Sequence, residues 1–211
     1  MDGLLFSTEP IYYQCYKKAA AEQGLDFTFE LFEACVGIST EDAARLIEHH
    51  FGHTVDIPNL YKHTYGNFEE YVRKGGDIPF RPGAKEAVEY FHQRGLTLAV
   101  ASSNIRRWVE GLLTKKGIRP FFSSLMTSED VSTPKPDPEI YLATAQKLRH
   151  DASDCLVFED SVAGATAAIS AGMRTCVVPQ IKQPDTFVRE NAFKIYKSLE
   201  DIYPDMDELL G

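Results

Sequence analysis

The sequence has no apolar run of membrane-spanning length, few cysteines and a deficit of positive charge. Its four cysteines show no metal-ligand spacing, and 22 Lys and Arg face 31 Asp and Glu, which gives a formal net charge of −9. These absences argue against a membrane span, a disulfide scaffold and a nucleic-acid-binding surface. We therefore expect a cytoplasmic monomer with no membrane or nucleic-acid partner.

The composition of the sequence is typical of a globular protein. Of the 211 residues, 44% are hydrophobic and 25% are charged, which is enough apolar material for a sizeable core and a small accessory domain. Helix-type periodicity fills the first part of the chain and predicts helices at 11–23, 28–36, 40–50 and 60–72. No strand-like alternation stands out there.

From residue 79 onward, helices alternate with short apolar strands. The pattern predicts helices at 83–93, 105–116, 138–148 and 164–171, and strands at 98–101, 125–127, 155–158 and 175–178. Such alternation forms a doubly wound parallel sheet. We expect an α/β fold with an inserted α-helical cap domain, in which residues 1–9 and 79–211 form the core and residues 10–78 form the cap.

Two adjacent carboxylates, Glu159 and Asp160, follow the strand expected at Cys155–Phe158, an apolar run predicted to be fully buried. They fall at the carboxyl end of the sheet, where open α/β sheets bind their ligands. Neighbouring carboxylates repel each other unless a cation lies between them, and Mg²⁺ is the expected one. The alternative is a plain helix start, with Asp160 or Ser161 as N-cap.

Two further segments carry groups that suit a phosphate. The strand expected at 98–101 ends in Ser102, Ser103 and Asn104, whose hydroxyls and free N–H groups at a helix start would bind an anion. Lys135 stands between two prolines, which stiffen the backbone around it. This lysine is therefore a candidate to meet an anion, and a solvated loop lysine is the alternative.

Four signatures follow one another along the chain: MDGLLFSTEP at its start, VASSN from residue 100, TPKPDP from residue 133 and FEDSVAGATAAISAGM from residue 158. Together they resemble the haloacid dehalogenase superfamily, in its β-phosphoglucomutase- and phosphatase-like subgroup with a helical cap after the first motif. The resemblance covers essentially the whole chain. It implies phosphoryl transfer through an aspartyl-phosphate intermediate, with a small phosphorylated metabolite as substrate and Mg²⁺ as cofactor.

The resemblance also implies roles for individual residues. Asp2 matches the family's general acid/base, which lends its backbone carbonyl to Mg²⁺, and Lys135 matches the lysine that orients phosphate and nucleophile. The implied sites are catalytic Asp2 and Lys135; phosphate-binding Ser102, Ser103, Asn104 and Lys135; and metal-binding Asp2, Glu159 and Asp160.

The family's nucleophilic aspartate has no counterpart in this sequence. In the family pattern Asp-x-Asp-Gly, Asp2 takes the second acidic position, so the first would stand immediately before Met1. The strand that leads to it lies at the centre of the family's sheet, and only Met1 and Asp2 could belong to it here. We expect a sequence shortened at its N-terminus relative to an active parent. The alternative is a catalytically dead protein that binds a phosphate ester.

The expected cap departs from the pattern of the family's phosphosugar mutases. By resemblance, Tyr12 stands where a mutase has a histidine that assists its acid/base, and Val36 and Thr40 stand where it has a lysine and an arginine for a second phosphate. A mutase must hold its sugar at both ends in turn. These departures favour a Mg²⁺-dependent phosphatase of a sugar phosphate or nucleoside monophosphate, with a phosphosugar mutase as the alternative.

Overall fold

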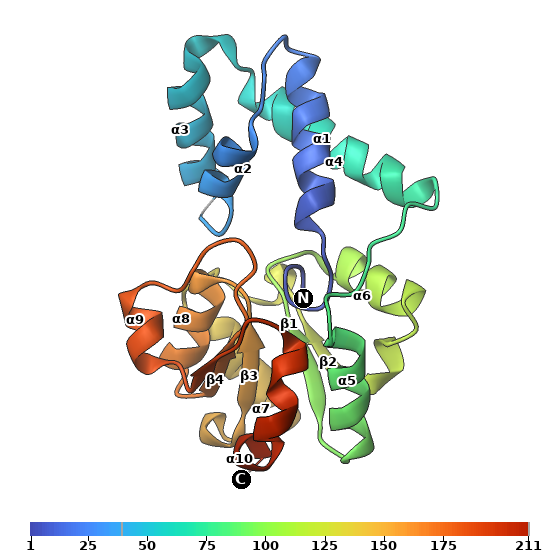
Figure 1. Cartoon of the computed structure of the whole chain (residues 1–211), viewed down its shortest axis with the longest axis vertical. Coiled ribbons are helices and arrows are strands. Elements are labelled where there is room, and N and C mark those ends of the chain that lie inside the picture. Colours follow the sequence, from blue (N-terminus) through green and yellow to red (C-terminus); the bar gives the residue numbers. More distant parts are fainter. Residues whose placement is uncertain (39, 211) are drawn as a thin grey trace. The chain divides into compact units, whose positions relative to one another are not determined.

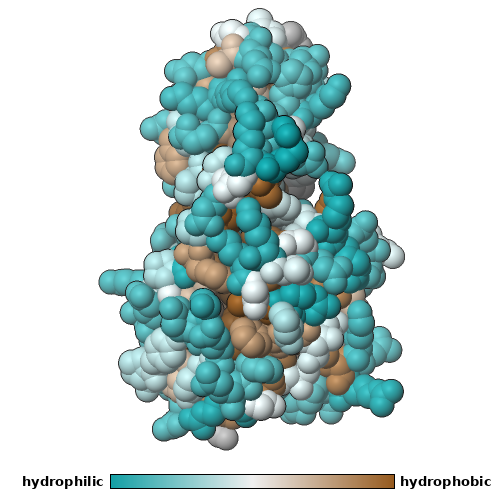
Figure 2. Space-filling model, turned by 90° about the vertical axis from the view of Figure 1, so that its right-hand side faces the viewer, coloured by the Kyte–Doolittle hydropathy of each residue, from teal (hydrophilic) through white to brown (hydrophobic). Residues whose placement is uncertain are grey.

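The computed structural model describes residues 1–38 and 40–210. It divides into two compact units, Met1–Phe6 with Phe80–Gly211, and Ser7–Pro79 (Figure 1). We call the first the core unit and the second the helical unit. In the described part, no helix combines the length and the apolarity needed to cross a membrane. Hydrophilic residues cover most of the face drawn in Figure 2.

The strands of the core unit are all paired in parallel. The described ones are β1 (Leu98–Ala101), β2 (Phe122–Met126), β3 (Leu156–Glu159), β4 (Arg174–Val177) and β5 (Lys194–Ile195). β1 pairs with β2, and β4 pairs with both β3 and β5. The predicted α/β class with parallel strands is confirmed. The described strands nevertheless form two separate sheets, β1-β2 and β3-β4-β5, a division that the sequence pattern did not predict.

Strand bounds agree with prediction wherever the apolar run is unbroken. β1 spans the predicted residues, and β3 and β4 are each displaced by one residue. β2 begins three residues before its predicted start, because Ser123 and Ser124 interrupt the apolar pattern there. β5 has two residues, too few to show a period, and the sequence did not predict it.

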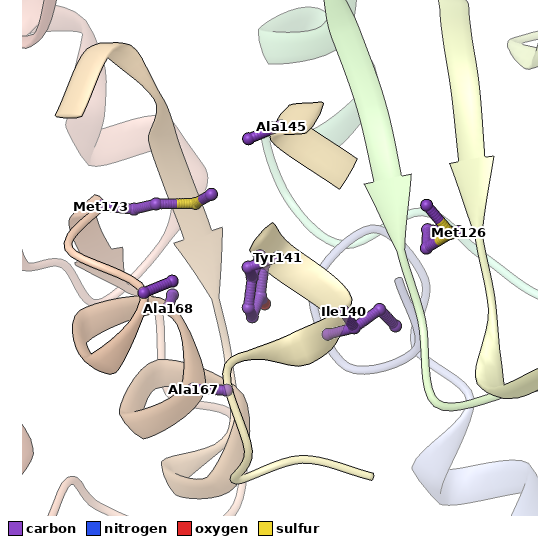
Figure 3. Close-up of a cluster of buried hydrophobic side chains, with 8 residues drawn as sticks. Met126, Ile140, Tyr141, Ala145, Ala167, Ala168 and Met173 are labelled. Atoms are coloured by element: carbon purple, nitrogen blue, oxygen red, sulfur yellow. The ribbon is translucent and has the colours of Figure 1, made fainter. Parts of the chain in front are cut away.

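Helices and 3-10 segments connect the strands of the core unit. The helices are α5 (Ala84–Gln93), α6 (Arg106–Lys115), α7 (Glu139–Leu148), α8 (Val162–Ser170), α9 (Thr186–Asn191) and α10 (Met206–Leu210), and the 3-10 segments are η2 (Arg119–Phe121), η3 (Ser128–Asp130), η4 (Ala152–Asp154) and η5 (Leu199–Asp205). α7 packs on β1 and β2, and α8 packs on β3 and β4. One buried cluster joins Met126 of β2, Tyr141 of α7 and Ala168 of α8 (Figure 3). Helix α7 therefore connects the two sheets through apolar packing.

The prediction of a fully buried strand at Cys155–Phe158 is wrong. All four of these residues are half-buried, whereas three of the four residues of β4 are buried. The reason lies in the pairing of β3, which among the described strands is hydrogen-bonded to β4 alone. The side of β3 away from β4 borders a cavity of about 370 Å³.

The helical unit contains α1 (Glu9–Ala21), α2 (Phe29–Cys35), α3 (Thr40–Phe51), η1 (Gly52–Thr54) and α4 (Ile57–Arg73). Side-chain caps start two of the helices, since Thr28 accepts a hydrogen bond from Leu31 N and Asp56 accepts one from Asn59 N. Helix α1 packs on α4. At that contact Tyr12 stacks on Phe68, with 4.1 Å between ring centroids and 2° between ring planes. Tyr12 therefore serves as a packing residue within this unit.

Candidate active site

Glu159, the last residue of β3, holds a buried carboxylate at the carboxyl end of the strand. The residue is 5% exposed. Its Oε1 accepts hydrogen bonds from Lys135 Nζ and from Tyr141 OH, both at 2.5 Å. Its Oε2 accepts from Asp160 N at 3.1 Å, from Ser161 Oγ at 3.2 Å and from Ser161 N at 3.4 Å. Five donors thus surround this one carboxylate.

Lys135 reaches from its loop to the carboxyl ends of two strands. Besides the ion pair with Glu159, its Nζ donates to Ala101 O, at the end of β1, at 3.3 Å and to Tyr141 OH at 3.1 Å. The side chains of Lys135 and Glu159 are 9% and 7% exposed. The ion pair is therefore buried, and it joins the end of the β1-β2 sheet to the end of the β3-β4-β5 sheet.

Helix α8 approaches this pair closely because of one glycine. A Cβ atom at Gly164 would lie 2.2 Å from the carboxyl carbon of Glu159, so any larger residue there would force this carboxylate to shift. Ser161 is the N-cap of α8 and accepts a hydrogen bond from Gly164 N at 3.1 Å. The N-cap that the sequence offered as an alternative interpretation is therefore present at Ser161, and the same hydroxyl also donates to Glu159.

The surroundings of the pair fix its charges. Burial acts to raise the pKa of Glu159, but the Lys135 and N-terminal ammonium charges and the hydrogen bonds from Lys135 and Tyr141 outweigh it and lower that pKa to about 2. Burial, together with the charge of Glu159, raises the pKa of Tyr141 well above its ordinary value. At neutral pH the site therefore holds a carboxylate anion and a neutral phenol that donates to it.

The segment after β1 contains the residues predicted to hold phosphate. Ser102 is 4% exposed, and its Oγ accepts a hydrogen bond from Asn104 N at 3.2 Å. Ser103 is exposed, and α6 begins at Arg106, two residues beyond the predicted phosphate-binding segment. Asn104 Nδ2 donates to Asp2 Oδ2 at 3.4 Å, and Trp108 Nε1 lies 3.5 Å from Asp2 Oδ1. The structure thus brings Asp2 and Asn104 together beyond the carboxyl end of β1.

The acidic residues differ in their capacity to hold Mg²⁺. Within residues 1–38 and 40–210, no group of three or more His, Cys, Asp or Glu side chains is placed to hold a metal ion. Mg²⁺ does not require such a group, because one or two carboxylates with substrate phosphate and water commonly hold it. A carboxylate offers about four acceptor positions, which the five donors to Glu159 fill. Asp160, which is half-buried, is therefore the carboxylate that fits Mg²⁺ best, and Asp2, also half-buried, is expected to supply its backbone carbonyl.

The sequence pattern did not identify Tyr141, Trp108 and Gly164 as residues of the candidate site. Tyr141 lies in a correctly predicted helix, but its role depends on a hydrogen bond to a residue 18 positions away, which no local pattern reveals. Gly164 did give a signal, because a glycine inside an Ala-rich helix costs about 0.5–1 kcal/mol relative to alanine and calls for a compensating contact.

The sequence matches the profile described as haloacid dehalogenase-like hydrolase over residues 1–178. A phosphorylated carbohydrates phosphatase of Thermotoga maritima is 30% identical over 174 residues, which cover 82% of this chain and 79% of that protein. A bifunctional riboflavin kinase/FMN phosphatase of Arabidopsis thaliana is 29% identical over 203 residues, which cover 96% of this chain and 52% of that protein.

A solved structure extends the likeness to the fold. The β-phosphoglucomutase of Clostridium difficile superposes with a TM-score of 0.74 and 21% sequence identity, over 99% of this chain and 93% of that one. At this identity the likeness concerns the fold alone. It spans the α/β architecture together with the helical unit.

Replacing Gly164 tests the close approach of α8 to Glu159. We expect Gly164→Ala to lower the free energy of unfolding by about 1–3 kcal/mol, because the added methyl group overlaps the carboxylate. Gly111→Ala in α6 is the matched control, since a Cβ there meets nothing within 4 Å, and it should raise the free energy of unfolding by about 0.4–1 kcal/mol. Urea unfolding, monitored by circular dichroism, measures the free energy of unfolding of both variants. Equal stability of the two variants would contradict the close approach.

The lowered pKa of Glu159 predicts loss of stability in acid. Its folded-state pKa of about 2 lies below the ordinary 4.5, so the unfolded chain binds more protons between these values. The stabilisation is fully present above about pH 4.5 and is lost as the pH falls toward 2. Glu159→Gln lacks this titration, so its free energy of unfolding should fall less over that window. Urea titrations at several pH values measure this, and parallel pH curves for the two proteins would refute the assignment.

Proposed function

Because the chain belongs to the haloacid dehalogenase-like hydrolase family, we propose that it hydrolyses a small phosphomonoester in a reaction that depends on Mg²⁺. It is a phosphoric monoester hydrolase of that family. The proposed substrate is a sugar phosphate or a nucleoside monophosphate, which is supported by one relative named for phosphorylated carbohydrates and another named for FMN. A cytoplasmic monomer stays our expectation.

The observation that carries this proposal is the buried ammonium of Lys135 at the ends of β1 and β3. A carboxylate nucleophile and a phosphate ester are both anionic, so positive charge must be fixed where they meet. Glu159, with Tyr141 beside it, holds this ammonium in one place. We infer that Lys135 orients the phosphate and that Glu159 acts as its positioning residue, with no direct metal contact.

The remaining polar groups take complementary roles in this proposal. The side chain of Asp160 and the backbone carbonyl of Asp2 would hold Mg²⁺, which when bound neutralises charge on the phosphate. Ser102 and Asn104 would donate hydrogen bonds to phosphate oxygens. Asp2 would give a proton to the leaving oxygen and take one from water. In the family pattern the nucleophile is an aspartate two positions before the residue that Asp2 matches.

A phosphatase is favoured over a phosphosugar mutase by the position of Tyr12. A mutase has a histidine there to assist proton transfer. In this chain Tyr12 stacks face to face on Phe68 and so contributes apolar packing instead. The proposal therefore requires no second phosphate site.

Two variants on the same stretch of chain test the role of Lys135. Phosphate release from a panel of sugar phosphates and nucleoside monophosphates is measured for a protein with aspartate placed immediately before Met1, with Mg²⁺ and with excess EDTA. We expect hydrolysis only with Mg²⁺, and we expect Lys135→Met to lower kcat by about 10²–10³-fold. Lys147→Met, at an exposed position of α7, should keep the parent rate.

Asparagine in place of the added aspartate should remove activity, and Asp160→Asn should raise the Mg²⁺ concentration required for half-maximal rate. Circular dichroism confirms that each variant is folded. A folded Lys135→Met protein with parent kcat would overturn the proposed role of this lysine. Hydrolysis that persists in EDTA would overturn the dependence on Mg²⁺.

A further inference from the structure

The loop that carries Lys135 connects η3 to α7 and lies at the surface of the core unit. Ser132, Thr133 and Pro134 are all exposed. The side chain of Lys135, in contrast, is buried against the ends of β1 and β3. An exposed loop gains little from apolar burial, while fixing its backbone costs conformational entropy. Polar interactions within the loop must therefore hold it in the conformation that buries this lysine.

The carboxylate of Glu139, the first residue of α7, supplies such an interaction. Its Oε1 accepts a hydrogen bond from Ser132 N at 2.9 Å, and its Oε2 accepts one from Thr133 N at 2.7 Å. The two oxygens thus bind two successive backbone N–H groups of the loop. These hydrogen bonds lower the pKa of Glu139, so the side chain is an anion at neutral pH.

A second acidic side chain closes the same loop. Asp137 Oδ1 accepts a hydrogen bond from Glu139 N at 2.9 Å, and Asp137 N donates one to Pro134 O at 3.1 Å. The chain therefore closes on itself twice around Lys135, once through the turn from Pro134 to Asp137 and once through the side chain of Glu139. The prolines on both sides of Lys135 remove further backbone freedom.

Helix α7 connects this closed loop to the buried ammonium. Glu139 begins the helix, and the hydroxyl of Tyr141, two residues later, accepts a hydrogen bond from Lys135 Nζ at 3.1 Å. Tyr141 also belongs to the buried cluster that joins the two sheets. The start of the helix is thus fixed in the core, and the carboxylate of Glu139 ties the loop to that fixed point.

A simpler role for Glu139 would be its interaction with the helix dipole. An acidic residue in the first turn of a helix is favourable for its charge alone, and Glu86 in the first turn of α5 is another example. Glu139 does more than supply charge, because each of its oxygens accepts a hydrogen bond from a backbone N–H outside the helix. The two roles can therefore be separated by experiment.

We propose that Glu139 is a positioning residue that acts through Lys135. By binding the two N–H groups before Pro134, it fixes the loop in the conformation that places the Lys135 ammonium at the ends of β1 and β3. Glu139 itself contacts neither substrate nor metal in this role. The consequence for catalysis rests on the proposed function, whereas the control of the buried lysine does not.

The variant Glu139→Gln tests this proposal on the chain as it stands. Glutamine has one acceptor oxygen, so at least one of the two backbone N–H groups loses its partner. The rate at which acetic anhydride acetylates Lys135 is measured by peptide mass spectrometry, relative to the rate at exposed Lys147 in the same molecule. We expect this relative rate to rise by about 10-fold or more, because loss of a hydrogen bond to a charged group favours local opening by such a factor.

Two controls separate this effect from others. Glu86→Gln removes an exposed first-turn carboxylate from α5 and should leave the relative rate at Lys135 unchanged. Half-buried Lys194, whose ammonium is paired with two carboxylates elsewhere in the core unit, reports general loosening of the fold and should keep its rate in Glu139→Gln. An unchanged rate at Lys135 in Glu139→Gln, or an equal rise at Lys194, would overturn the proposal.

Hydrogen exchange of the parent protein provides a test that needs no variant. Ser132 and Thr133 are exposed, so their amides should exchange as fast as in an unfolded peptide unless Glu139 binds them. We expect both amides to exchange at least about 10-fold more slowly than that. Exchange of either amide at the unfolded rate would contradict the proposal.

Phosphate release, measured as for Lys135→Met, tests the effect on catalysis. Glu139→Gln should lower kcat by about 10-fold and change KM by less than about 3-fold. Added to Lys135→Met, it should lower kcat no further, because the ammonium that it positions is gone. Losses that multiply in the double variant would overturn the positioning role. Faster acetylation of Lys135 in Glu139→Gln, with no hydrolysis by any protein, would support the positioning role and refute the proposed function.

Discussion

The buried ion pair between Lys135 and Glu159 is the interaction on which the arrangement of the core unit depends. It draws on a loop lysine, the end of β3, the last carbonyl of β1 and the phenol of Tyr141 in α7. Two charges taken out of water are tolerated only when they are paired and hydrogen-bonded, and removal of one partner typically costs about 3–5 kcal/mol. The positions of α7 and α8 follow from that requirement, since one supplies a hydroxyl and the other supplies Gly164.

The acidic residues of the site differ in their burial and in their hydrogen bonding. Glu159 accepts hydrogen bonds from five donors, one of them Lys135, while Asp2 and Asp160 are less buried. A fixed ammonium flanked by less buried carboxylates is a suitable arrangement for an anionic substrate that arrives with a divalent cation. In the proposed chemistry, Glu159 therefore positions the ammonium of Lys135, and other acidic residues bind Mg²⁺.

Local patterns in the sequence predicted two strand ends and several residues of the candidate site. The runs 98–101 and 155–158 located two strand ends, because the apolar run of each parallel strand stops abruptly at polar residues, and the two prolines marked Lys135 as a constrained side chain. The same patterns placed Ser102 and Glu159 at strand ends. They could not reveal that Lys135 and Glu159 are bonded to each other, since the contact joins residues 24 positions apart.

Other features were beyond any local pattern for physical reasons. The role of Tyr141 depends on the packing of α7 between the sheets, and β5 is too short to show a period. The half-buried state of Val157 and Phe158 depends on whether a neighbouring strand covers them, and their own hydrophobicity predicts the opposite. Apolar patterning thus located the strands, while their pairing set their burial.

A double-mutant cycle on Lys135→Met and Glu159→Gln tests the central claim most directly. The free energy of unfolding is measured in urea at pH 7 for the parent, both single variants and the double variant. If the buried pair organises the core unit, each single change leaves a buried polar group without its partner, and the double variant should be more stable than the sum of the single effects by at least about 1.5 kcal/mol. Single effects that add to within about 0.5 kcal/mol would contradict this account.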